Sequence, residues 1–166
     1  MLEDHAKLLE VLHHARDGIG RRKLQKILYV LKKLHFPFHE QFHFQFYGPY
    51  SEEAALRVQE LCNLKFLHEQ ESGKGHGVYV LSEEGKAFLQ HHDVHMPGLD
   101  RCVHLLNAQS TRFLTLLATV LHFSELPPKE TERKVFAHHR QQGYTKQDIE
   151  EAVRFGRQLQ PKHFAM

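Results

Sequence analysis

The chain has no tryptophan and two cysteines among its 166 residues, and this scarcity limits what can stabilise the fold. Cys62 and Cys102 lie far apart in apolar helical patterns, where a free thiol behaves as a small core residue. No CxxC pair or Cys/His spacing typical of structural zinc occurs. We therefore expect buried free thiols, and an apolar core rather than cross-links as the source of stability.

Long apolar runs are also missing, and no stretch approaches the roughly 18 residues that a membrane-spanning helix needs. The most apolar segment, from Phe113 to Phe123, is interrupted by two threonines and a histidine. The N-terminus begins Met-Leu-Glu-Asp and lacks the basic-then-apolar order of a signal peptide. We expect a cytoplasmic protein with no membrane partner.

The motifs of common catalytic and cofactor sites are absent as well. The chain contains no P-loop, no GxGxxG and no GxSxG motif. The glycine-rich stretch from Gly73 to Gly77 lacks both the spacing and the following helix of a phosphate-binding loop. Because no nucleophile–base pair stands out, the sequence predicts a protein that is not an enzyme and that uses no cofactor.

Sixteen histidines are the most unusual feature of the composition. His91 and His95 are four residues apart, so one helical face could present two imidazoles to a metal ion. The glutamate of a zinc-protease motif is missing there, and the histidines are spread over most of the chain. A compositional bias explains them better than a constellation of ligands, and we predict no metal site.

The formal net charge of +2 conceals an uneven distribution along the chain. Residues 1–35 carry eight Lys/Arg against four Asp/Glu, giving +4, whereas residues 36–96 carry four against nine, giving −5. Residues 97–166 carry ten against seven, giving +3. Such asymmetry suits the selection of a protein partner or self-association. A homodimer that pairs the −5 and +4 regions, and an internal pairing of the same regions, both remain open.

Apolar periodicity predicts a mainly helical fold. Helical spacing covers residues 8–15, the stretch from Arg21 to Leu34 and the stretch from Ser51 to Leu64. Phenylalanines at positions 42, 44 and 46 alternate with polar residues as in a strand, and strands at residues 66–70 and 78–81 flank a polar loop. We expect an α+β fold with a small antiparallel β-wing, namely a winged-helix-like domain at residues 1–95 with a helical extension at residues 96–166 packed on it.

Hydroxyl side chains mark the predicted helix starts. Ser51 and Ser82 each precede a pair of glutamates, which the positive end of a helix dipole favours. Thr145 and Asp148 resemble a capping box in which aspartate replaces the usual glutamate or glutamine. These signals predict helices that begin directly after residues 51, 82 and 145.

The segment around the Gly48-Pro49 dipeptide is the preferred binding surface. It joins the aromatic strand to the next helix, and aromatic residues near a turn are frequent anchors of protein interfaces. The helix that follows begins with acidic residues, which disfavours contact with phosphates. We expect a protein partner to contact this surface, formed by Tyr47, Gly48, Pro49, Tyr50, Ser51, Glu52, Glu53 and Arg57.

A DNA-binding regulator is the alternative function, since winged helices commonly bind duplex DNA. The basic residues of the second predicted helix, together with one lysine of the wing, would then hold phosphates. The simpler interpretation of these residues is a solvated helix face that pairs with the acidic central region. The alternative site consists of Arg21, Arg22, Lys23, Lys26 and Lys74.

Two sequence elements resemble a known family. The stretch Lys23-Leu24-Gln25-Lys26-Ile27-Leu28-Tyr29, followed by an aromatic strand and Tyr47-Gly48-Pro49-Tyr50-Ser51, is similar to the paired signature of Panacea-type, SocA-like antitoxin domains. That similarity covers roughly residues 1–92, and the whole chain resembles the YwgA family more closely. The resemblance to Panacea domains implies a protein-binding module that neutralises toxins or presents substrates to proteases. The resemblance therefore implies a non-enzymatic antitoxin-like or adaptor-like binding module.

Overall fold

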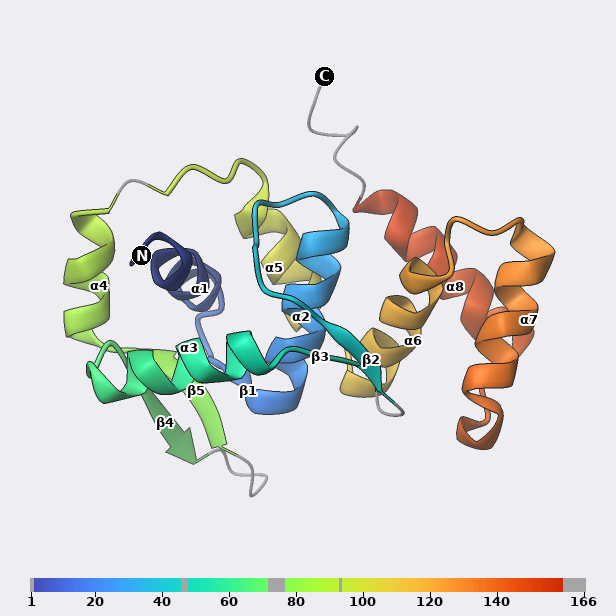
Figure 1. Cartoon of the computed structure of the whole chain (residues 1–166), viewed down its shortest axis with the longest axis horizontal. Helices are drawn as coiled ribbons and strands as arrows, with labels where there is room; N and C mark the ends of the chain where they lie inside the picture. The colour runs from blue at the N-terminus through green and yellow to red at the C-terminus, as the bar shows by residue number, and fades with distance from the viewer. Residues whose placement is uncertain (1, 46–47, 72–76, 93, 160–166) are drawn as a thin grey trace.

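The computed structural model describes residues 2–45, 48–71, 77–92 and 94–159. The N-terminal half contains, in chain order, α1 (Leu2–His14), β1 (Ile19–Gly20), α2 (Arg21–Lys33), β2 (His43–Gln45), β3 (Gly48–Tyr50), α3 (Glu52–Asn63), β4 (Leu67–Glu71), β5 (Gly77–Leu81) and α4 (Glu83–Gln90). The remainder is helical and contains α5 (Leu99–Asn107), α6 (Thr111–His122), α7 (Pro128–His138), a 3-10 turn (Arg140–Gln142) and α8 (Lys146–Gln158) (Figure 1). The fold is α+β, mostly helical with small antiparallel sheets, as predicted.

The helices begin where the sequence predicts their caps. The Ser51 side chain accepts a hydrogen bond from the backbone N–H of Ala54, and Ser82 caps α4 in the same way. Thr145 and Asp148 form both hydrogen bonds of a capping box at the start of α8. Each cap satisfies a backbone donor that would otherwise lack a partner and contributes about 1 kcal/mol. The predicted starts of these three helices are confirmed.

The three-stranded sheet has the order β1-β5-β4 and is antiparallel throughout. Ile19 pairs with Tyr79, and Leu67 pairs with Leu81 at the other side of β5. The sequence pattern predicts the hairpin strands, and it contains no strand signal at Ile19–Gly20. β1 was therefore not predicted, because a strand of two residues is too short to show any period of its own.

The phenylalanine strand does not belong to this sheet. β2 instead pairs with β3, with Phe44 opposite Pro49, so the Gly48-Pro49 dipeptide lies within a strand and does not form the predicted turn. Proline fits here because a two-stranded sheet has only edge strands, which need no N–H from it. The Phe42 and Phe44 rings pack edge-on against Tyr29 of α2 at 5.5 and 5.7 Å between ring centroids.

Gly18 shows how tightly β1 is packed against the hairpin. Its φ is +84°, and an added Cβ would lie 2.8 Å from the Tyr79 carbonyl oxygen. We expect Gly18→Ala to lower the free energy of unfolding by about 2 kcal/mol or more, since a strained backbone and a backbone clash add together. Urea denaturation measures this loss.

Gly143 supplies the control for Gly18. Its φ is +73°, but nothing lies within 4 Å of an added Cβ. Gly143→Ala should therefore lower the free energy of unfolding only by the cost of a positive φ for alanine, about 1 kcal/mol. Equal losses at the two positions would show that the close approach between Gly18 and β5 contributes nothing.

The main hydrophobic core surrounds α1. This helix packs against α3, α4, α5 and β5, and its Leu8, Leu9 and Val11 side chains are fully buried. α2 packs against α5 and α6, and buried residues of α5 and α6 belong to the same core as those of α1. Packing is thus continuous across residue 95, where the sequence suggests a division. α7 and α8 lie at the opposite end of the molecule from α4 (Figure 1).

A second, smaller core joins the C-terminal helices, with Leu116, Val135, Ile149 and Ala152 at its centre.

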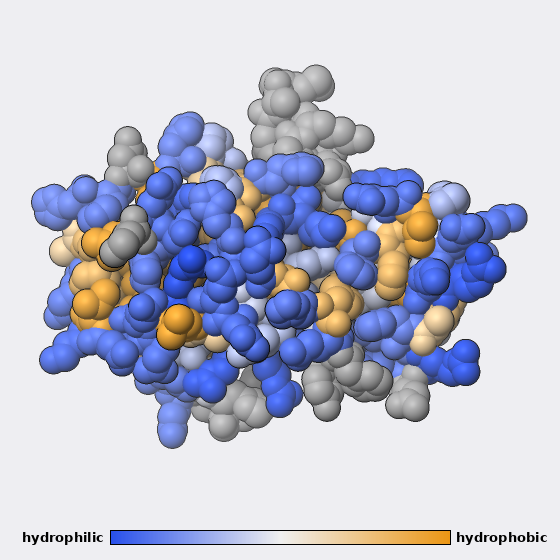
Figure 2. All heavy atoms as spheres, viewed as in Figure 1, coloured by the Kyte–Doolittle hydropathy of each residue, from blue (hydrophilic) through white to orange (hydrophobic). Residues whose placement is uncertain are grey.

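The face of the molecule in Figure 2 is mainly hydrophilic, with hydrophobic residues in separate spots. Leu56 on α3 and Leu64 just after it are 61% and 50% exposed. Over the described residues, no helix combines the length and apolar character needed to cross a bilayer.

Candidate functional site

The two sequence elements that resemble the Panacea signature meet in space. α2 supplies Gln25 and Lys26, and β3 supplies the residues after the phenylalanine strand, while α6 closes the third side. Between them lies a cavity of about 570 Å³, which we call the motif cavity. Its described lining consists of Arg21, Arg22, Gln25, Lys26, Gln45, Gly48, Pro49, Tyr50, Thr111, Arg112, Thr115 and Gln142.

A pair of hydrogen bonds between Gln25 and Ser51 fixes the position of the two elements. The Gln25 side-chain amide donates to the Ser51 carbonyl oxygen at 3.0 Å, and the Ser51 N–H donates to the Gln25 Oε1 at 2.8 Å. Both residues are buried, so water does not compete for these bonds. Since the Ser51 hydroxyl also caps α3, one residue connects α2 to the start of α3.

Gly48 has a φ of +105°, a backbone conformation that favours glycine, and it places the β3 backbone beside Lys26. An added Cβ at this glycine would lie 3.5 Å from Thr115 Cγ2 and 3.8 Å from Lys26 Cε. Strand β3 therefore covers the aliphatic part of the lysine, and Lys26 is 6% exposed. The sequence pattern favours a solvated face for the basic residues of α2, and for Lys26 that interpretation is wrong because β3 covers it.

Basic side chains dominate the motif cavity. Arg21, Arg22, Lys26 and Arg112 line it, and its described lining includes no Asp or Glu. Burial lowers the pKa of Lys26, and the nearby positive charge of Arg22 lowers it further. The arrangement provides charge and hydrogen-bond donors, which suits the binding of an anionic group.

Two of the arginines are held by neighbouring residues. The Arg21 Nε donates to the Tyr79 hydroxyl at 3.0 Å, which raises the pKa of Arg21, and its guanidinium lies 3.7 Å from the Glu69 carboxylate. The Arg112 guanidinium donates to the Gln142 carbonyl oxygen at 2.7 Å and lies over the Tyr144 ring at 4.3 Å. These contacts restrict both arginines while leaving further N–H groups on each.

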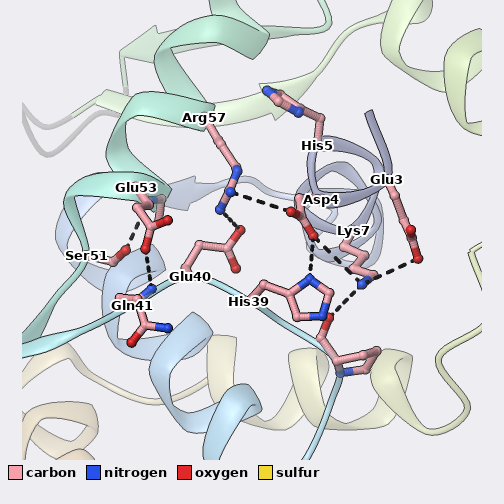
Figure 3. A network of polar contacts seen from close by, with 12 residues as sticks. Glu3, Asp4, His5, Lys7, His39, Glu40, Gln41, Ser51, Glu53 and Arg57 are labelled. Atoms are coloured by element: carbon pink, nitrogen blue, oxygen red, sulfur yellow. Dashed lines mark hydrogen bonds and ion pairs between the residues drawn. The ribbon is translucent and has the colours of Figure 1, made fainter. Parts of the chain in front are cut away.

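The acidic start of α3 belongs to a different network, drawn in Figure 3. Glu53 accepts a hydrogen bond from the Gln41 backbone N–H at 2.7 Å. Arg57 donates to the buried Glu40 carboxylate and lies 3.5 Å from the Asp4 carboxylate. This network fastens the segment before β2 to α1 and α3, so Glu53 and Arg57 have structural contacts in the folded chain.

The residues predicted as a protein-binding surface therefore occupy three environments. Gly48, Pro49 and Tyr50 line the motif cavity, and Ser51 is buried beneath it. Glu53 and Arg57 form the network of Figure 3, whereas Glu52 is exposed to solvent. Tyr47 lies outside the described residues.

The residues of the alternative DNA site are also separated. Arg21, Arg22 and Lys26 line the motif cavity, but Lys23 points elsewhere, since its ammonium donates to the Asn107 carbonyl oxygen at 2.5 Å. Lys74 of the predicted wing loop lies outside the described residues. Arg112 was not predicted as a site residue. The available signal was its position in the first turn of a helix that has no acidic residue there.

Histidines cluster at one place that has the ligand types of a metal site. Within the described part of the chain, Glu10, His13 and His14 of α1 have ligand atoms within 4.8 Å of one another. His13 is exposed, and His14 Nε2 lies 3.2 Å from the Glu10 carboxylate. The group is explained by an i,i+4 pair on a helix surface. The absence of a functional metal stays a prediction.

Comparison with known proteins identifies the family. No protein-family model matches the chain. The chain is 45% identical over 162 residues to the uncharacterized protein YwgA of Bacillus subtilis (strain 168), a match that covers 96% of this chain and 98% of that protein. Identity of this extent over nearly the full length of both proteins leaves no large segment unmatched. The chain therefore belongs to the YwgA family.

Proposed function

We propose that this protein is a non-enzymatic binding module that captures a protein partner, in the manner of an antitoxin or adaptor, and that the motif cavity is the centre of its binding surface. The observation that carries the proposal is the meeting of the two Panacea-like elements around one basic cavity. The Gln25–Ser51 hydrogen bonds hold these elements together, and half-buried Tyr50 lies at their junction. Aromatic and arginine side chains in such positions are frequent interface anchors.

A winged-helix-like frame is part of this proposal. The order β1-β5-β4, with α2 and α3 between β1 and β4 in the chain, supports a wing formed by the β4–β5 hairpin. A relationship to Panacea domains is also proposed, and the resemblance of the Lys23–Tyr29 stretch and of the Gly48–Ser51 stretch supports it. Within this frame, β2 and β3 form an addition that carries the motif cavity.

The first experiment is affinity purification of the tagged chain from the source organism, with mass spectrometry of the captured proteins. Arg22 is exposed and lines the motif cavity, so Arg22→Glu should reverse the charge at the cavity without disturbing the core. We expect the captured partner to fall about tenfold, because a like charge at an interface both slows association and weakens the complex. Lys33→Glu is the matched control, since Lys33 is an exposed residue at the other end of the same helix.

The same assay separates the motif cavity from the outer face of α3. Glu52→Lys reverses an exposed charge that is not part of the described lining of the motif cavity. Loss of capture in Glu52→Lys with full capture in Arg22→Glu would move the partner surface to α3. Full capture in both variants would contradict the proposed surface altogether.

DNA binding is the second candidate, which the strand order and the arginines at the start of α2 favour. The α3 helix argues against it, because Glu52, Glu53 and Glu60 are all exposed where a winged helix would contact the major groove. A duplex titration at several salt concentrations tests it. Affinity that falls steeply with salt and is lost in Arg22→Glu would favour DNA over a protein partner.

A further inference from the structure

We propose that the motif cavity contains an oxyanion subsite formed by Lys26 and the first turns of α2 and α6, and that this subsite binds a carboxylate of the partner protein. The inference rests on the proposed function, because it names the chemical group that the captured partner presents. Three observations carry it: a buried lysine side chain whose ammonium has no partner among the described residues, two unusual helix starts and the composition of the lining.

Lys26 is the first observation. Its side chain is more than nine-tenths buried and borders the cavity, and among the described residues no hydrogen bond or ion pair of its ammonium is found. Its Nζ is not one of the fully buried unpartnered atoms of the described chain, which is consistent with an ammonium that faces the cavity. The other buried lysine, Lys7, by contrast, donates to the Pro37 carbonyl oxygen at 2.7 Å and lies near two carboxylates. A charge that is largely removed from water and has no partner is unfavourable, and an anionic ligand in the cavity would compensate it. The lowered pKa of Lys26 agrees with this environment.

The starts of α2 and α6 are the second observation. Among the helices described, α1, α3, α4, α5, α7 and α8 each carry an acidic residue in the first turn, as the positive end of a helix dipole favours. α2 and α6 carry none and begin with Arg21-Arg22 and Thr111-Arg112 instead. These four residues line the motif cavity. The positive ends of two helices and three guanidinium groups therefore border one space, and an anion there would stabilise both helix starts.

The lining composition is the third observation. Gln25 uses its amide oxygen and nitrogen on Ser51, and the Thr115 hydroxyl donates to the Thr111 carbonyl oxygen, so these polar groups are already occupied. The Arg22 and Lys26 donors remain for a ligand, with the spare N–H groups of Arg112. All charged groups of the described lining are thus donors, which matches a group that only accepts, such as a carboxylate or a phosphate.

The size of the cavity favours an oxyanion that is part of a larger ligand. A volume of about 570 Å³ is in the range of ordinary ligand pockets and exceeds what a single carboxylate or phosphate fills. Pro49 and half-buried Tyr50 provide an apolar wall beside the charged groups. An acidic peptide segment fits both the charged groups and the apolar wall. Its carboxylate would reach Lys26 while its neighbouring atoms pack on Pro49 and Tyr50.

The test measures binding of an acetylated tetraglutamate peptide, of tetraglutamine and of inorganic phosphate by calorimetry or NMR. We expect tetraglutamate to bind and tetraglutamine not to bind. In Lys26→Met the affinity for tetraglutamate should fall at least about tenfold, as expected for the loss of a charged, desolvated contact. Lys33→Met, which removes an exposed lysine of the same helix, should bind like the unaltered chain.

Each of the other possible outcomes would contradict one part of the proposal. Binding of phosphate without tetraglutamate would overturn the partner carboxylate as the source and assign the subsite to a phosphate-bearing small molecule. Equal binding by Lys26→Met and the unaltered chain would overturn the subsite. Arg22→Gln, at an exposed position, repeats the test if Lys26→Met does not fold, and it should also weaken tetraglutamate binding.

Failure of this inference is distinguishable from failure of the proposed function. If Arg22→Glu loses its partner while no oxyanion probe binds the unaltered chain, the motif cavity remains the partner surface and the oxyanion subsite is wrong. If tetraglutamate binds through Lys26 but Lys26→Met still captures its partner fully, the subsite is real and the partner surface lies elsewhere.

Discussion

Replacing Arg57 by methionine should lower the free energy of unfolding by about 3–5 kcal/mol, the largest loss that we expect from a single substitution of a charged residue in this chain. The reason is Glu40, whose side chain is 1% exposed and whose Oε2 accepts a hydrogen bond from Arg57. The other carboxylate oxygen, Oε1, has no partner among the described residues. Without Arg57, a buried carboxylate would be left with neither charge compensation nor a side-chain donor.

Chemical denaturation of Arg57→Met measures this loss, and a double variant tests its cause. Glu40→Gln combined with Arg57→Met removes both charges, so it should recover a large part of the stability lost in Arg57→Met. Arg133→Met is the exposed control, because Arg133 lies 3.9 Å from Glu130 with both side chains in solvent, and we expect a change below about 0.5 kcal/mol. A double variant no more stable than Arg57→Met would show that packing of the arginine, and not its charge, explains the loss.

Acidification from pH 6.5 to pH 4 should destabilise the protein by about 3 kcal/mol through His139 alone. This histidine is 2% exposed at the end of α7, and burial, together with the adjacent His138, lowers its pKa to about 4. Its Nε2 contacts the Thr119 hydroxyl, which itself donates to the Thr115 carbonyl oxygen, so Nε2 carries the hydrogen. Its Nδ1 is buried and has no partner among the residues that the structure describes, so a proton there would be a donor with no acceptor among them.

The sign of the effect follows from the two protonation states. Because the folded pKa is depressed below its ordinary value of 6.5, protons bind the unfolded chain more readily, and the stabilisation by neutral His139 is complete above pH 6.5. It is lost as the pH falls towards 4. The ring packs against His138 at 4.7 Å and Tyr144 at 5.1 Å between centroids, neither of which supplies a negative charge in this range.

His139→Gln isolates this contribution from that of the other histidines. Its amide can still donate to Thr119 but does not titrate, so the difference in unfolding free energy between His139→Gln and the unaltered chain should change by about 3 kcal/mol between pH 6.5 and 4. Thermal unfolding at a series of pH values provides the measurement. A difference that stays constant over this range would show that His139 titrates normally in the folded protein.

The sequence predicts the local features of this fold well. Caps at Ser51, Ser82 and Thr145 depend on neighbours three residues away, so they can be identified without knowledge of the tertiary structure. β1 could not be identified in this way, because its two residues become a strand only through pairing with β5. β3 pairs with β2 and also packs against α2 and α6. Periodicity does not reveal these contacts with the helices.

The candidate site was only partly predictable for the same reason. Gly48, Pro49 and Tyr50 stand out as a local pattern, and they line the cavity. Gln25 and Ser51 are 26 residues apart, and Arg112 comes from a helix beyond both elements, so only the tertiary structure brings them together. Lys26 shares a basic stretch with solvent-exposed residues, and no local pattern distinguishes it from them.

The central position of α1 has a consequence for biosynthesis. The ribosome produces this helix first, yet the elements that cover it extend from α3 to α5, which ends at Asn107. At about 5–20 residues per second, its leucines wait roughly 5–20 s for the chain that buries them. During that interval the nascent chain exposes an amphipathic helix, the kind of apolar surface that makes incomplete chains prone to aggregate. Synonymous codons that slow translation before residue 107 should therefore lower the yield of folded protein more than slow codons after it.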